Sequence, residues 1–289
     1  MKTRIISGII IAVLLLLTLS SGGNLLAVCL CAVSLVASYE LSRAFGLRAT
    51  RRDRDDASKE DGSEKISAME TVGYLGVVLH YDILVLSGGD ARFFIGTVIT
   101  FILAETLIYV IRFPAYHVSH LTDTVFCFLY APVMLSFLFL IRELAWGHLL
   151  VWLPFLSWVC DTSAYFCGMA FGKHKLCPRL SPKKTVEGSV GGVFFTTVVA
   201  AVYGVILPGR SEYYNKRVIW ACMLIGLACG ILSQLGDLLA SGIKRDRGIK
   251  DYGTLIPGHG GIMDRFDSVI FVTPVVYFLI VFFMQPPGV

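Results

Sequence analysis

The polar segment of residues 241–267 (SGIKRDRGIKDYGTLIPGHGGIMDRFD) holds the densest group of side chains that could do chemistry. Its basic and acidic residues alternate, whereas a plain electrostatic anchor is uniformly basic. Carboxylates hold a hard divalent cation and Lys or Arg neutralises phosphate oxygens, so the mixture indicates a metal–phosphate site. The cations are Lys244, Arg245, Arg247, Lys250 and Arg265, and the acids are Asp246, Asp251, Asp264 and Asp267.

Glycines in the same segment add a second feature. Residues 257–261 (PGHGG) carry little side-chain bulk, so backbone amides there could approach an anion closely. His259 in this loop has two open roles, as a donor to a phosphate oxygen or in a structural hydrogen bond. The glycines alone indicate little, but with the neighbouring charges they favour a phosphate-binding loop.

An acidic residue lies just before this segment, inside an apolar run. Asp237, Ser241 and Lys244 are spaced by four and three residues, so they share one face of a helix. A carboxylate inside an apolar membrane helix is costly and normally faces a cavity or a partner. Asp237 is therefore predicted to face the site.

Two further carboxylates, Asp264 and Asp267, lie where the last apolar run begins. An ordinary helix N-cap would explain Asp264 by itself, because carboxylates are favoured at helix N-termini. However, Asp237 and Asp264 flank one short loop, and this pairing favours a metal site. We expect Asp237 and Asp264 to hold a hard divalent cation, with Asp267 in or beside the same ligand shell.

A second group of candidates lies between positions 157 and 188. Asp161 is an acid bounded by the aromatic residues Trp158 and Tyr165. Residues 173–188 carry five basic residues against one acid, so they either bind a phosphate or simply anchor the chain at a membrane surface. The predicted substrate-binding residues are Asp161, Ser181, Lys183, Lys184, Thr185, Ser241, His259 and Arg265.

The chain that positions these residues is too apolar for one soluble core. It is 55% hydrophobic and 16% charged, with a mean hydropathy of +0.71, whereas soluble domains are about 45–50% apolar and about 25% charged. Apolar runs of roughly 18–22 residues recur, each long enough to cross ~30 Å of hydrocarbon as a helix. We predict an all-α polytopic integral membrane protein with about nine transmembrane helices. The predicted spans are residues 5–21, 24–45, 69–87, 93–111, 121–141, 147–172, 189–207, 218–240 and 266–284.

Basic residues indicate the orientation of these spans. If the amino terminus and the loops after the second, fourth, sixth and eighth spans share one side, the other side holds only five of the 25 Lys and Arg residues. The positive-inside rule then places the richer side in the cytoplasm. The exceptions are Arg92, Arg142, Arg210, Lys216 and Arg217. The first run could pass for a signal peptide, but residues 20–22 form a poor cleavage site, so we expect a retained helix.

Polar residues divide the chain into two parts. Residues 1–156 are predicted to be scaffold and interface helices, with a charged cytoplasmic loop near 46–68. Residues 157–289 are predicted to be the catalytic region, with cytoplasmic loops at 173–188 and 241–264. Three early acids lack neighbours that would make a site and are expected to form interhelical hydrogen bonds: Glu40, Asp82 and Glu105.

Together these motifs resemble the signature of the bacterial-type CDP-diacylglycerol synthase (phosphatidate cytidylyltransferase) family. The resemblance is strong over roughly residues 157–270 and only hydropathic before them. Ser163 departs from the pattern, where glycine is expected, and this bears on packing alone. The matching positions are Ser241, Lys244, Arg245, Lys250, Asp251, residues 257–261, Asp264, Arg265 and Asp267, and upstream residues 161–165, 171–173 and 181–188.

The resemblance implies an enzyme of phospholipid biosynthesis that converts CTP and phosphatidic acid to CDP-diacylglycerol and pyrophosphate. It implies Mg²⁺ at a site that could also hold a monovalent cation such as K⁺. It further implies a homodimer in the bacterial cytoplasmic (inner) membrane, with the active site on the cytoplasmic side and no nucleic-acid partner. The residues assigned to catalysis are Asp237, Asp264, Lys244, Arg245, Lys250 and Asp267.

Two other functions fit parts of the pattern. A different membrane CTP-dependent transferase, such as a polyprenol kinase, would keep the charge chemistry and change the acceptor, but the length and order of the signature disfavour it. A transporter would place polar residues in both halves, often with repeat symmetry. Here they concentrate after residue 157, which favours an enzyme.

Overall fold

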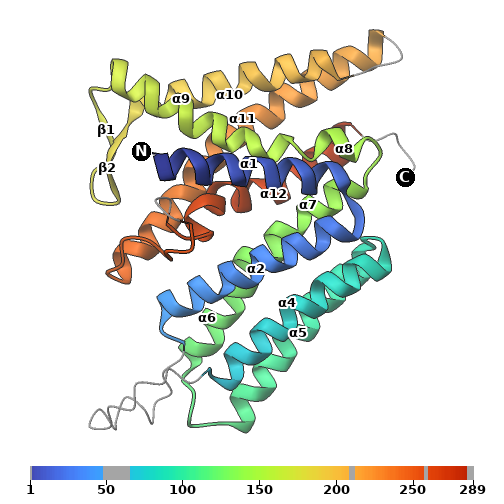
Figure 1. Ribbon diagram of the computed structural model, residues 1–289, viewed down its shortest axis with the longest axis vertical. Coiled ribbons are helices and arrows are strands. Elements are labelled where there is room, and N and C mark those ends of the chain that lie inside the picture. Colours follow the sequence, from blue (N-terminus) through green and yellow to red (C-terminus); the bar gives the residue numbers. More distant parts are fainter. Residues whose placement is uncertain (1, 48–65, 208–211, 257–259, 285–289) are drawn as a thin grey trace.

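The computed structural model describes residues 2–47, 66–207, 212–256 and 260–284 (Figure 1). Within these ranges the regular elements are helices apart from two short strands, and eight helical segments are long and apolar enough to cross a membrane. The first predicted span, residues 5–21, corresponds to α1, whose residues Ile10–Ser21 form a shorter apolar helix. The predicted all-α polytopic class is therefore confirmed. The helices are α1 (Lys2–Ser21), α2 (Gly23–Phe45), α4 (Ala68–Ser87), α5 (Ala91–Ile111), α6 (Val118–Phe128), α7 (Met134–Glu143), α8 (Gly147–Leu150), α9 (Leu156–Phe171), α10 (Val186–Ile206), α11 (Glu212–Asp246) and α12 (Met263–Phe283).

The helices form two packed groups that meet at α12. In one group α10 lies between α9 and α11, and in the other α2 packs on α4 and α4 on α5 (Figure 1). The last helix, α12, packs on α11 and also on α7. The start of α12 therefore lies where elements from both halves of the chain can reach it.

Helix ends alternate between two sides of the molecule, as the predicted topology requires. The end of α2, the α5–α6 turn and the end of α11 gather at the left and bottom of Figure 1, whereas the α1–α2, α4–α5 and α7–α8 turns lie at the right. The 35-residue helix α11 is about 52 Å long at ~1.5 Å per residue, which exceeds a ~30 Å hydrocarbon core. Its basic start, Lys216 and Arg217, can therefore project beyond the bilayer on the poorly charged side.

The segment of residues 173–188, predicted as a loop between two spans, contains a short β-hairpin. Strands β1 (Lys175–Cys177) and β2 (Ser181–Thr185) form an antiparallel hairpin there, and α10 begins directly after β2. The Glu187 carboxylate, in the first turn of α10, accepts hydrogen bonds from the backbone N–H groups of Lys173 (3.0 Å) and His174 (3.2 Å). The two ends of the hairpin are thereby tied together, which local sequence patterns did not reveal.

The early acids have different environments. Glu40 is buried and accepts two hydrogen bonds from the start of α12, so its predicted role in bonding between helices is confirmed. Glu105 is also buried, but neither oxygen of its carboxylate has a hydrogen-bond partner among the described residues. The predicted interhelical hydrogen bond of Glu105 is therefore wrong. Asp82 is exposed.

Glycines let α10 and α11 approach closely. A Cβ added at Gly230 would lie 2.8 Å from the Cα of Val193, and one at Gly226 would lie 2.9 Å from the Cα of Thr197. Both contacts are with backbone atoms, which cannot move without separating the helices. This close packing sets the position of Asp237, two turns further along α11.

Gly230→Ala is expected to lower the free energy of unfolding by about 1–3 kcal/mol, because the added methyl group overpacks the α10–α11 contact. Thermal unfolding of the detergent-solubilised protein measures this loss. Gly96→Ala in α5 is the matched control, since no heavy atom lies within 4 Å of its added Cβ and it gains the same helix propensity. Equal stability of the two variants would contradict the packing argument.

Candidate active site

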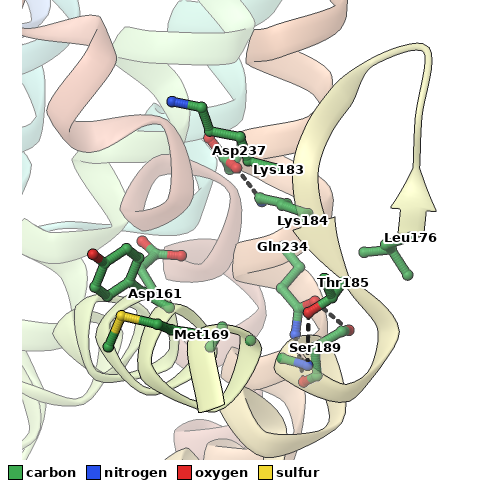
Figure 2. Close-up of a pocket in the computed structure, with 13 residues that line it drawn as sticks. Asp161, Met169, Leu176, Lys183, Lys184, Thr185, Ser189, Gln234 and Asp237 are labelled. Carbon is green, nitrogen blue, oxygen red and sulfur yellow. Dashed lines mark hydrogen bonds and ion pairs between the residues drawn. The ribbon is translucent and has the colours of Figure 1, made fainter. Parts of the chain in front are cut away.

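A cavity of about 430 Å³ opens between α9, α10, α11 and the hairpin. Its wall combines charged side chains with apolar residues such as Met169 and Leu176 (Figure 2). The cavity therefore offers charged and apolar surface to the same ligand. The predicted site residues that line it are Asp161, Lys183, Lys184, Thr185 and Asp237.

An ion pair crosses this cavity. Lys184 on β2 pairs with the Asp237 carboxylate on α11 (Figure 2), and the two side chains are 27% and 30% exposed. The Lys184 Nζ itself, however, is buried and has no hydrogen-bond partner among the described residues. A buried ammonium needs an anion beside it, which is either Asp237 or another group that enters the cavity.

Three carboxylates lie near one another beside the cavity. Asp237 and Asp161 repel each other electrostatically, and buried Asp267 is repelled by both. The Ser268 hydroxyl lies within hydrogen-bond distance of Asp161 (3.2 Å) and Asp267 (3.1 Å). Gly236 permits this proximity, because a Cβ there would lie 2.9 Å from the backbone oxygen of Asp267. The tight α11–α12 contact thus concentrates negative charge at one place.

Asp264 lies in a separate set of contacts. Its carboxylate accepts hydrogen bonds from Lys244 Nζ (2.8 Å), Tyr252 N (2.9 Å) and Gly261 N (3.0 Å). The Asp264 side chain is only 6% exposed. In this arrangement Asp264 holds the loop between α11 and α12 together, and it is not the N-cap of α12, which begins after Ile262.

Tyr252 fastens the same loop to α11. Its buried hydroxyl donates to the backbone oxygen of Ala240 at 3.0 Å. Burial raises the pKa of this hydroxyl, so it stays protonated and continues to donate. Lys244 Nζ lies 5.4 Å from the centre of the Tyr252 ring, within reach of a cation–π contact.

Five other predicted site residues lie outside the lining of this cavity. Ser181 and Ser241 are half-buried, whereas the side chains of Arg245, Lys250 and Arg265 are exposed. His259 lies outside the described residues. The substrate-binding and catalytic assignments of these six residues stay predictions.

Two residues that sequence patterns did not assign to the site hold it in place. Gln234 Nε2 on α11 donates to the backbone oxygens of Ser189 (3.1 Å) and Gly230 (3.0 Å). Glu40 on α2 bonds to the start of α12. Each is a polar residue inside an apolar run. Because burying a polar side chain in a membrane helix is costly, its presence there was the only indication of a role in the sequence.

Asp237 is the carboxylate best placed to hold a metal ion with a substrate. Within residues 2–47, 66–207, 212–256 and 260–284, no three His, Cys, Asp or Glu side chains are grouped so that they alone could hold one. Mg²⁺ is usually held by one or two carboxylates together with water and substrate phosphates. Asp237 fits that role, because it lines the cavity and its negative neighbours favour a cation there. Asp264 could join only by giving up Lys244.

Asp264→Asn is expected to lower the free energy of unfolding by about 1–3 kcal/mol, because Lys244 and two backbone amides lose part of their acceptor. Asp237→Asn is the matched control and should change it by less than about 1 kcal/mol, since loss of the Lys184 pair is offset by relief of the repulsion from Asp161 and Asp267. Thermal unfolding in detergent compares them. Equal shifts would contradict the different roles assigned to the two acids.

Comparison with known proteins places the chain in a family. The model of the cytidylyltransferase family matches residues 2–283. Among similar proteins, the phosphatidate cytidylyltransferases of Staphylococcus saprophyticus and Staphylococcus aureus (strain COL) are each 40% identical, over 161 and 163 residues. That of Staphylococcus epidermidis is 38% identical over 161 residues.

These alignments cover part of each protein. The aligned region is 55% of this chain and 60% of each relative. The family model, in contrast, extends from the first described helix to the end of the last, and so includes every helix that positions the cavity. The chain belongs to the cytidylyltransferase family.

Proposed function

We propose that this protein transfers a cytidylyl group from CTP to phosphatidic acid, giving CDP-diacylglycerol and pyrophosphate. The observation that carries the proposal is the cavity in which Lys183, Lys184 and Asp237 lie beside apolar Met169 and Leu176. Such a cavity suits one substrate from water and one from the bilayer. The names of the staphylococcal relatives support the same reaction.

The main requirement of this reaction is to neutralise the negative charge of the phosphates. An oxygen of the phosphatidic acid phosphate forms a bond to the α-phosphorus of CTP, and the bond between the α- and β-phosphates breaks to release pyrophosphate. A phosphate monoester is already ionised at pH 7, so no strong general base is needed. Positioning and charge neutralisation therefore supply most of the catalysis.

The cavity residues take the roles that this chemistry requires. Lys183 and Lys184 bind phosphate oxygens, and Lys184 leaves Asp237 to do so. On the loop side, Lys244 and the neighbouring cations neutralise the triphosphate and the departing pyrophosphate. Tyr252 and Asp264 keep Lys244 beside the loop, and its release from Asp264 frees its charge for the departing pyrophosphate.

We include Mg²⁺ in the proposal. Asp237 would hold it, with Asp267 nearby and Asp264 after release of Lys244, and the ion would neutralise charge on the phosphates. The proposal also includes a bacterial inner-membrane location with a cytoplasmic active site, supported by the distribution of basic residues. The family resemblance is the support for a homodimer.

The reaction is tested with the purified full-length chain in detergent, labelled CTP and two alternative acceptors. Label is expected in a CDP-lipid when phosphatidic acid and Mg²⁺ are supplied. Asp237→Asn, in protein that elutes as wild type does, should abolish this incorporation. Label in a polyprenol product, or in no lipid, would overturn the proposed reaction, and wild-type turnover by Asp237→Asn would overturn its assigned role.

The cavity lysines provide a second test. Lys183→Ala and Lys184→Ala should each lower kcat/KM about tenfold or more, because each removes a charge-assisted hydrogen bond to phosphate. Lys175→Ala is the matched control, since Lys175 is exposed on β1 of the same hairpin and does not line the cavity. If all three variants behave alike, the lysines only anchor the hairpin at the membrane surface.

A further inference from the structure

We propose that Glu40, on α2, is a positioning residue for the active site: it fixes residues 252–256 and 260–262, between α11 and α12, and the start of α12 itself, which surround Asp264 and carry Asp267. Glu40 belongs to the first half of the chain, outside the motifs that indicated function. The inference that Glu40 affects turnover rests on the proposed function, whereas the inference that it holds the loop and the start of α12 rests on the structure by itself.

The Glu40 carboxylate binds the first N–H groups of α12. Its Oε1 accepts from Ile262 N at 3.1 Å and its Oε2 from Met263 N at 2.8 Å, and the residue is only 3% exposed. Amides in the first turn of a helix lack an intrahelical acceptor, and the helix dipole favours a negative charge there. Glu40 therefore caps α12 from a position 222 residues away in the sequence.

The loop is shaped around this carboxylate. A Cβ added at Gly253 would lie 2.8 Å from Glu40 Cδ, and one at Gly261 would lie 2.6 Å from the same atom. At Gly261 the three nearest atoms are all from the Glu40 carboxyl group. Both glycines thus serve to admit Glu40, and any larger residue would displace the loop or the acid.

The contacts of Glu40 interleave with those of Asp264. Gly261 N donates to Asp264, the next two amides donate to Glu40, and Asp264 follows directly. The two acids therefore divide the amides at the start of α12 between them. If Glu40 is removed, Ile262 and Met263 lose their acceptor, and the Asp264–Lys244 pair loses its support.

Hydrogen–deuterium exchange of the substrate-free protein in detergent tests the structural part. Glu40→Ala is expected to speed exchange of the amides of residues 261–264 about tenfold, because the Ile262 and Met263 amides lose their acceptor and the adjacent amides open with them. Glu40→Gln keeps one acceptor oxygen and should give a smaller increase. The matched control is Glu105→Gln, which alters another buried acid of the first half that bonds to no described residue, and it should exchange as wild type does.

Turnover with CTP and phosphatidic acid tests the positioning role. Glu40→Ala should raise KM for CTP several-fold and leave KM for phosphatidic acid unchanged, since Lys244, which is assigned to the triphosphate, is held by Asp264 beside the amides that Glu40 binds. A loss of folded protein alone would lower the apparent kcat and change neither KM. The Gln variant should recover part of the CTP affinity.

A double-substitution cycle provides an independent check. Gly261→Ala alone should speed exchange in the loop, because its methyl group overlaps the Glu40 carboxylate. In the Glu40→Ala background the obstacle is gone, so the added effect of Gly261→Ala should be much smaller. Strictly additive effects would overturn the proposed contact.

Wild-type exchange at residues 261–264 in folded Glu40→Ala, or in folded Glu40→Gln if the Ala variant does not fold, would overturn the inference. An unchanged KM for CTP alongside faster exchange would overturn the positioning role. A wild-type protein that incorporates no label from CTP would overturn the proposed reaction instead, and the exchange result would still decide whether Glu40 holds the loop.

Discussion

The cost of placing charge inside an apolar helical body shapes this protein. Removing a carboxylate from water is costly, and donors or a cation can compensate for its lost hydration. Asp264 receives Lys244 and two loop amides, and Glu40 receives the amides of Ile262 and Met263 at the start of α12. Since both acids draw their donors from the α11–α12 connection, satisfying them also determines the conformation of that loop.

Exposure separates two kinds of ion pair. Lys184 and Asp237 line the cavity and are each close to 30% exposed, so they face the space that a ligand would occupy. Lys244 and Asp264 are 17% and 6% exposed and share their environment with backbone amides. The first pair is suited to exchange partners during a reaction, whereas the second is suited to hold the loop that surrounds it.

The first half of the chain takes part in the site through contacts with the second. Besides Glu40, Asp123 on α6 lies 3.8 Å from Arg247, just past the end of α11, and the Arg247 guanidinium lies 4.6 Å from the centre of the Phe45 ring. The connection between α11 and α12 is thus contacted at both ends by early helices. Phosphoryl-group chemistry depends on positioning, so these contacts give the early helices a role beyond that of scaffold.

The sequence by itself determined the helical membrane class, the positions of the spans and the polar segments, because hydropathy and helix periodicity depend on neighbouring residues. It also selected Asp237, a carboxylate inside an apolar run, and Asp264, which lies across one short loop from it. The packing of the helices was needed to show that Asp237 lines the cavity, that Asp264 binds the loop and that Glu40 caps α12. Those contacts join residues far apart in the chain, and their donors are mostly backbone amides, which every residue type except proline offers and no motif can distinguish.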